Sequence, residues 1–164
     1  MEVKDAIKTF NFALENQIRF IIKDLPVEDF SWRPTNSAPS IGWTIGHILV
    51  NHDFTINHRI CGNPIEFSHL IPIFGFNTDG NLPKDQTVDQ LLEKLKILNG
   101  TITEVILSKE NDWFEQLANT EGFPPNWQGK NIMKVFVLHF NHCFTHCGQI
   151  LEIKRQLGKG AWGF

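Results

Sequence analysis

Residues 132–158 read IMKVFVLHFNHCFTHCGQILEIKRQLG. An α-helix advances about 100° per residue, so apolar residues at three- and four-residue steps share one face. Five apolar residues of this stretch lie on such a stripe: Ile132, Val135, Ile150, Ile153 and Leu157. Three histidines fall in the middle of the same stripe: His139, His142 and His146. The pattern predicts a helix over 132–157, ended by Gly158, whose buried face is basic at its centre, where polar groups need partners.

His142 and His146 are four residues apart, which places their rings on adjacent helical turns. This H-x-x-x-H spacing lets two imidazoles share one metal ion. A pair of core histidines with backbone or side-chain partners has the same spacing, so the spacing alone leaves both interpretations open. A catalytic metal site has three protein ligands and an exchangeable position, so a third ligand has to come from another part of the chain.

The histidines of the second predicted helix are the main candidates for that third ligand. This helix is expected over 41–60, with Ser40 as its N-cap and with Gly62 and Pro64 closing it. His52 lies on an apolar face with Ile41, Ile45, Ile48, Leu49 and Ile56, whereas His47 lies on a second face with Trp43, Val50, Asn51, Phe54 and His58. Periodicity does not choose between His47 and His52, and the loop residue His69 is a weaker candidate.

Two further helices complete the expected architecture. One runs over 3–24 before Pro26, and the other opens with the capping box Thr87–Gln90 and runs to Leu107. No segment has a convincing strand pattern. The chain is therefore expected to form a single all-α domain over 1–164, a four-helix bundle with long crossover connections. The connectors are residues 27–40, 61–86 and 109–130.

The composition is that of an ordinary globular protein, with 41% hydrophobic and 20% charged residues. The net charge of -3 gives no reason to expect a nucleic-acid partner. No apolar run approaches the roughly 20 residues of a membrane span, and the N-terminus has no apolar core for a signal peptide. The three cysteines fit a reducing compartment. We therefore expect a cytoplasmic protein with no nucleic-acid or membrane partner.

Three stretches carry a resemblance to a known family: SIGWTIGHILVNHD (40–53), IPIFGFNTDGNLP (71–83) and HFNHCFTHCGQILEIKRQLG (139–158). In order and spacing they resemble the DinB/YfiT-like superfamily of metal-binding four-helix bundles. The last stretch is the most specific, because it is similar to the family's N-H-x-x-x-H-x-G-Q-I signature. Cys147 is a departure, since a basic residue often follows the last histidine there.

The resemblance implies a three-histidine metal site made of His47, His142 and His146, with His52 and His139 outside the ligand set. It implies a divalent transition metal, zinc or nickel, and a homodimer. Several family members are thiol S-transferases or isomerases that use a low-molecular-weight thiol such as bacillithiol, mycothiol or glutathione. The leading hypothesis is therefore a thiol-dependent S-transferase or related isomerase, in which a metal-held thiolate attacks an electrophilic small-molecule substrate. The alternatives are a hydrolase that uses metal-bound water and a non-catalytic metal- or ligand-binding stress-response protein.

Supporting roles are predicted for residues near these histidines. Asn51 and Gln149 each lie one turn from a ligand and are expected to orient the imidazoles. His58 is the preferred acid/base candidate, ahead of Asp53. Aromatic residues of the connectors and tail are expected to wall the pocket: Phe74, Phe76, Trp127 and Trp162. Arg33 and Arg59 are candidates for binding an anionic group of a thiol. Cys143 and Cys147 are expected to pack in the core, and the alternative is that one of them replaces a histidine as a metal ligand.

Overall fold

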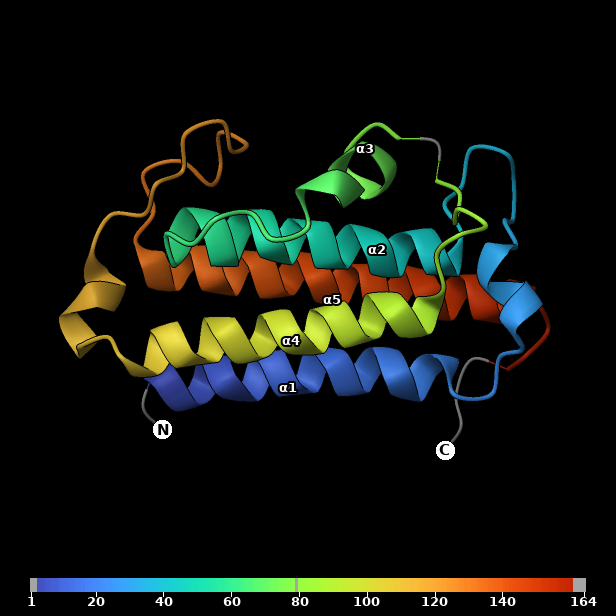
Figure 1. Ribbon diagram of the computed structural model, residues 1–164, viewed down its shortest axis with the longest axis horizontal. Coiled ribbons are helices and arrows are strands. Elements are labelled where there is room, and N and C mark those ends of the chain that lie inside the picture. Colours follow the sequence, from blue (N-terminus) through green and yellow to red (C-terminus); the bar gives the residue numbers. More distant parts are fainter. Residues whose placement is uncertain (1–2, 79, 161–164) are drawn as a thin grey trace.

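The computed structural model describes residues 3–78 and 80–160, and it confirms the all-α bundle (Figure 1). Its long helices are α1 (Val3–Ile22), α2 (Ile41–His52), α4 (Val88–Leu107) and α5 (Ile132–Gln156). Short helical segments lie between them: η1 (Val27–Ser31), η2 (Asp53–Ile60), η3 (Ser68–Leu70), α3 (Ile71–Phe74) and η4 (Asn111–Glu115). The β-structure of the described residues is one isolated bridge, Leu117 to Asn131.

The helices are not packed in the order of the chain. Both α1 and α2 pack against α4 and α5, so that consecutive helices α1 and α2 lie on a diagonal of the bundle. Figure 1 shows α1 and α5 running in one direction and α2 and α4 in the other. The segment after α2 therefore returns along the length of the bundle before α4 begins, which is the expected crossover. None of the described helices has both the length and the apolar character needed to cross a bilayer.

Local signals fix the helix ends. The Ser40 hydroxyl accepts the Trp43 N–H at 3.1 Å, and Thr87 and Gln90 form the reciprocal capping box. Gly158 has a φ of 74° and follows the last turn of α5, as the C-terminal glycine of a helix commonly does. The first helix ends at Ile22, two residues before the predicted end, with Pro26 in the extended link to η1.

The bounds of the helix predicted over 41–60 are confirmed, but its second half is not an α-helix. It is α-helical only to His52 and continues as the π-helix η2. The buried Asp53 carboxylate anchors this segment to the following loop, because it accepts the Phe67 N–H at 2.7 Å and the Asn57 amide at 2.8 Å. Each residue turns less in a π-helix than in an α-helix. The side chain of His58 is therefore rotated away from the helix face that a 3.6-residue period predicts for it.

Each long helix has at least one polar side chain that is at most 8% exposed. Four of these, one from each helix, are called the buried polar layer: Asn11, His52, Asn99 and His139. His52 Nδ1 and His139 Nε2 are 2.8 Å apart and share a hydrogen bond. Within the described part of the chain, His52 Nε2 and both amides have no hydrogen-bond partner of normal geometry. Burial lowers the pKa of His52 to about 4, although the nearby Asn99 amide opposes this shift.

This layer predicts acid sensitivity. The pKa of His52 is about 4 in the folded state, against 6.5 as its ordinary value, so the unfolded chain binds more protons between these pH values. The contribution of His52 to the free energy of unfolding is therefore complete above pH 6.5 and is lost as the pH falls toward 4. We expect His52 to account for a loss on the order of 3–3.5 kcal/mol, at about 1.4 kcal/mol for each unit of this pKa difference. Urea unfolding at several pH values should show that the free energy of unfolding falls less steeply with pH in His52→Gln than in the wild type. His69→Gln, at an exposed position, is the matched control and should behave as the wild type. Equal slopes in wild type and His52→Gln would exclude this role.

Candidate metal centre

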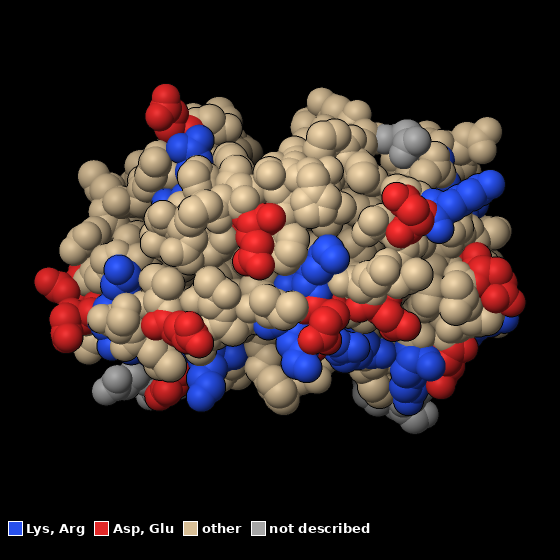
Figure 2. All heavy atoms as spheres, viewed as in Figure 1, with Lys and Arg blue, Asp and Glu red and all other residues tan. Residues whose placement is uncertain are grey.

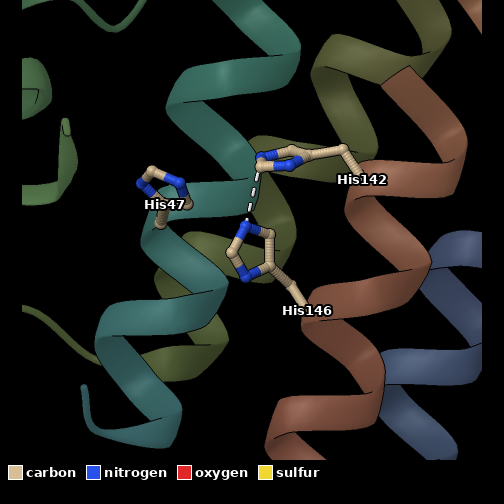
Figure 3. Close-up of side chains that lie close together, drawn as sticks. All are labelled: His47, His142 and His146. Carbon is tan, nitrogen blue, oxygen red and sulfur yellow. Dashed lines mark hydrogen bonds between the residues drawn. The ribbon is translucent and has the colours of Figure 1, made fainter. Parts of the chain in front are cut away.

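Three imidazoles converge between α2 and α5 (Figure 3). His47 comes from α2, and His142 and His146 come from adjacent turns of α5. One candidate ligand atom of each residue lies within 4.8 Å of the others. The three therefore form a compact cluster of nitrogen donors, contributed by two helices that run antiparallel.

His47 is held from two sides. Its Nδ1–H donates to the Phe74 carbonyl oxygen at 2.7 Å, which leaves Nε2 with a free electron pair. Its ring stacks on Trp43, one turn earlier, with ring centroids 4.7 Å apart. The Phe74 ring reaches α2 because position 46 is glycine, where a Cβ atom would overlap that ring. The crossover segment thus fixes both the tautomer and the orientation of this imidazole.

The two histidines of α5 face each other through Nε2. His146 Nδ1–H donates to the Gln149 side-chain oxygen at 2.7 Å, so its Nε2 also carries a free electron pair. The His142 and His146 Nε2 atoms are 3.1 Å apart. Two nitrogen ligands on one tetrahedral zinc ion, each at 2.0–2.1 Å, lie about 3.3 Å from one another. The separation of this pair therefore suits a shared metal ion.

The electrostatics keep all three imidazoles neutral at pH 7. Burial, together with the neighbouring His146 and His47, lowers the pKa of His142 to about 4. Burial also lowers the pKa of His47 and of His146, although the hydrogen bonds that these rings donate to Phe74 and Gln149 oppose the shifts. Neutral imidazole is the form that binds a metal, and it suits zinc and nickel better than magnesium or calcium. The donor set thus fits a divalent transition metal.

A cavity of about 550 Å³ opens beside the cluster. One wall is polar and contains the helix residues His47, Asn51, Thr55, His139 and His142. The remaining lining residues are largely aromatic: Phe54 of η2, Phe123 and Trp127 with Gly122 and Pro124 of the 116–131 loop, and Phe76 of the segment that follows α3. Figure 2 shows a notch in the upper edge of the molecule, between the 116–131 loop and the α3 segment, with mostly uncharged side chains around it. Among the described residues, no Asp, Glu, Lys or Arg lines this cavity.

The comparisons with known proteins agree with this architecture. The family model of the DinB superfamily matches residues 13–150, a range that includes all three clustered histidines. The chain belongs to the DinB superfamily. No curated protein matches the sequence. Membership in the superfamily and the histidine cluster together point to metal binding in this DinB protein.

The other predicted residues of the DinB site lie in different surroundings. Asn51 donates through its amide nitrogen to His47 Nε2 at 2.9 Å, the nitrogen that faces the cluster, and not to the ring nitrogen on the far side. His58 does not line the cavity, and its Nδ1–H donates to the Asn63 carbonyl at 2.8 Å. Asp53 is fully buried, and its carboxylate accepts a hydrogen bond from Asn57 within η2. His139 lines the cavity as the partner of His52.

The expected wall residues divide into two groups. Phe76 and Trp127 line the cavity, whereas the fully buried Phe74 contributes its carbonyl to His47. Trp162 lies outside the described residues. Sequence reasoning did not predict Trp43 as a support of His47, although the four-residue spacing of the pair was a usable signal. It also missed the roles of Phe54 and Phe123 in the aromatic wall.

The two arginines are tied to protein groups. Arg33 donates to the carbonyls of Asn36 and Ala38 and to the Asn81 side chain, so it holds the loop before α2 together. Arg59 lies over the Phe54 ring, 5.3 Å from its centroid, and its Nη1 donates to the Asn119 side chain at 3.4 Å. Neither guanidinium lines the cavity.

The cysteines of this DinB protein are poor nucleophiles. Cys143 and Cys147 are buried on α5, at 0% and 2% exposure. Burial raises the pKa of the Cys147 thiol to about 12 and raises the pKa of Cys143 as well. Burial also raises the pKa of Cys61 to about 12. Since the thiolate is the reactive form, none of the three supplies a nucleophile at neutral pH.

Asn51 and Gln149 are expected to affect metal affinity in opposite directions. Gln149→Ala removes the acceptor that sets the His146 tautomer, so zinc affinity should fall by about 10- to 100-fold. Asn51→Ala removes a hydrogen bond that competes with the metal for His47 Nε2. This bond has a net value of about 0.5–1.5 kcal/mol, so affinity should rise by roughly two- to tenfold. Competitive zinc titration against a chromophoric chelator measures both effects, and weaker binding in Asn51→Ala would show that the amide supports the bound state.

Proposed function

We propose that this DinB protein is a metal-dependent enzyme that uses an external low-molecular-weight thiol to attack an electrophilic small molecule, as a thiol S-transferase or a related isomerase. The observation that carries the proposal is the convergence of His47, His142 and His146 on one point with neutral rings. These residues would hold a zinc or nickel ion. When bound, the metal would supply Lewis acidity that favours the thiolate form of an exchangeable thiol ligand.

The protein's own groups support this chemistry in three ways. The Phe74 carbonyl and the Gln149 side chain each hold a ligand imidazole in the tautomer that presents Nε2. Three neutral imidazoles leave the full charge of a divalent ion uncompensated, which favours an anionic ligand such as a thiolate. The largely apolar lining of the cavity would limit the access of water to the reacting groups.

The sulfur has to come from outside the chain, because the thiols of Cys61, Cys143 and Cys147 have raised pKa values. The alternative hydrolase would be helped by a general base close to a bound water. No described carboxylate lines the cavity, and Asp53 is occupied by Phe67 and Asn57. The transferase is therefore favoured over the hydrolase. The free cysteines also agree with the expected reducing cytoplasm.

The test is a reaction that needs a thiol. The zinc-loaded and nickel-loaded proteins are incubated with 1-chloro-2,4-dinitrobenzene and with bacillithiol, mycothiol or glutathione in separate assays. We expect the thioether and chloride to form faster than in the uncatalysed reaction with at least one thiol. His142→Ala, incubated with the same metal, should show only the uncatalysed rate.

Controls without thiol separate the alternatives. Hydrolysis of 4-nitrophenyl acetate by the metal-loaded protein in the absence of thiol, lost in His142→Ala, would support the hydrolase. Stoichiometric metal binding without turnover in either assay would support a binding protein. Either result would contradict the transferase.

A further inference from the structure

The cavity beside the histidine cluster has one wall that the metal site does not use. Phe54 of η2, Phe123 and Trp127 form this wall, and the last two belong to the loop between η4 and α5. The centroids of Phe54 and Phe123 are 6.1 Å apart, and those of Phe123 and Trp127 are 5.7 Å apart with an interplanar angle of 82°. Three rings from two separate segments thus make a continuous aromatic surface in the lining of the cavity.

This aromatic wall is built in advance of any ligand. Phe123 is 7% exposed, and its loop is closed by hydrogen bonds from the Phe123 N–H to the Thr120 carbonyl and from the Gln128 side chain to the Phe123 carbonyl. The Trp127 N–H donates to the Pro124 carbonyl at 2.8 Å, which fixes the turn that carries the indole. Rings held in this way lose little conformational freedom when a ligand binds, which favours affinity.

The charges of the site limit what the cavity accepts. None of its described lining residues is a Lys, Arg, Asp or Glu. Arg59 is near, but its guanidinium lies over Phe54 and bonds to Asn119. A charged group placed against the aromatic residues, away from the proposed metal, would lose its hydration without gaining a partner of opposite charge. A ring in the same place would gain edge-to-face or stacked contacts with three aromatic side chains.

We propose that this cavity is the electrophile subsite and that it selects substrates whose body is an uncharged aromatic ring. The inference rests on the proposed function, since it places the electrophile beside a thiol held at His47, His142 and His146. A volume of about 550 Å³ suits a small-molecule ligand. Trp127 is assigned as the specificity-determining residue, because its side chain is only partly buried whereas that of Phe123 is 7% exposed.

The first experiment compares two thiols, phenylmethanethiol and ethanethiol, in which a phenyl group of the first replaces a methyl group of the second. The cobalt-loaded protein is titrated with phenylmethanethiol and with ethanethiol, and the thiolate-to-cobalt absorption band gives each dissociation constant. We expect phenylmethanethiol to bind at least tenfold more tightly. Trp127→Ala should remove most of this difference and leave ethanethiol binding within twofold of wild type. Phe12→Ala, an exposed phenylalanine on α1, should behave as wild type.

A second experiment does not need the metal. Saturation-transfer NMR with nitrobenzene and nitroethane is recorded for the wild type, His142→Ala and Trp127→Ala. We expect transfer to the ring protons in the first two proteins, transfer at least twofold smaller in Trp127→Ala, and little transfer to nitroethane.

The outcomes distinguish the inference from the proposed function. Equal affinity for the two thiols in a protein that binds cobalt would overturn the aromatic subsite and leave the metal site intact. A protein that does not bind cobalt would overturn the proposed function. If its contacts with nitrobenzene still depend on Trp127, the aromatic selectivity of the cavity would be supported. Nitrobenzene contacts that are unchanged in Trp127→Ala would overturn the role of this wall.

Discussion

Replacing His146 with alanine weakens zinc binding by more than about a hundredfold. Loss of a group that merely orients a ligand costs about 10- to 100-fold in metal affinity, and His146 is proposed as a ligand itself. Its Nε2 lies 3.1 Å from that of His142, so its removal also leaves His142 without its neighbour. The dissociation constant follows from competition with a chromophoric chelator. The same loss is expected for His47→Ala and His142→Ala.

His139→Gln is the matched control for this prediction. His139 lies on α5, one turn before His142, and is 1% exposed, but its Nε2 is engaged with His52. We expect this variant to retain zinc affinity within about threefold, provided that circular dichroism shows a folded helix bundle. If zinc affinity falls as much in His139→Gln as in His146→Ala, the metal would have to bind in the buried polar layer, which would contradict the three-histidine site.

Replacing Phe74 with alanine lowers the free energy of unfolding by about 3–5 kcal/mol, the usual cost of removing a buried phenylalanine ring. Phe74 is fully buried and packs its ring on α2 at Gly46. Phe76, only two residues further along the same segment, is 86% exposed. Phe76→Ala is therefore expected to change the free energy by no more than about 0.5 kcal/mol. Urea unfolding of the metal-free proteins measures both changes.

A second substitution tests whether the Phe74 ring acts through its contact with Gly46. Gly46→Ala should cost about 1–3 kcal/mol, because the added methyl group overlaps the ring. The same change should cost much less in a Phe74→Ala background, since neighbouring sites are not additive. Additive losses in the double variant would show that Gly46 is required for another reason.

The sequence predicted the parts of this fold that local chemistry controls. Ser40 and the Thr87–Gln90 capping box mark the starts of α2 and α4, and Gly158 follows the end of α5. The π-helix after His52 was not predicted, because apolar residues do not report whether a backbone hydrogen bond spans four or five residues. That change of phase is also why His58 does not lie on the His47 face.

The candidate site depended on more than periodicity. Every residue of α2 except Asn51 is buried, so a hydrophobic pattern could not separate His47 from His52. The family resemblance selected His47, and the structure brings His47 together with His142 and His146. The pairing of His52 with His139 depends on the register between two helices, which a pattern along one helix does not contain. The Asn11 and Asn99 members of that layer were missed for the same reason.

The most direct test of the central claim is X-ray absorption spectroscopy of the zinc-loaded protein after unbound metal has been removed. We predict about one retained zinc ion per chain, with about three imidazole nitrogens at 2.0–2.1 Å and one further light ligand. A sulfur scatterer at about 2.3 Å would contradict the three-histidine site and point to a cysteine ligand. A protein that retains no zinc, or holds it through water and carboxylate oxygens alone, would contradict it as well.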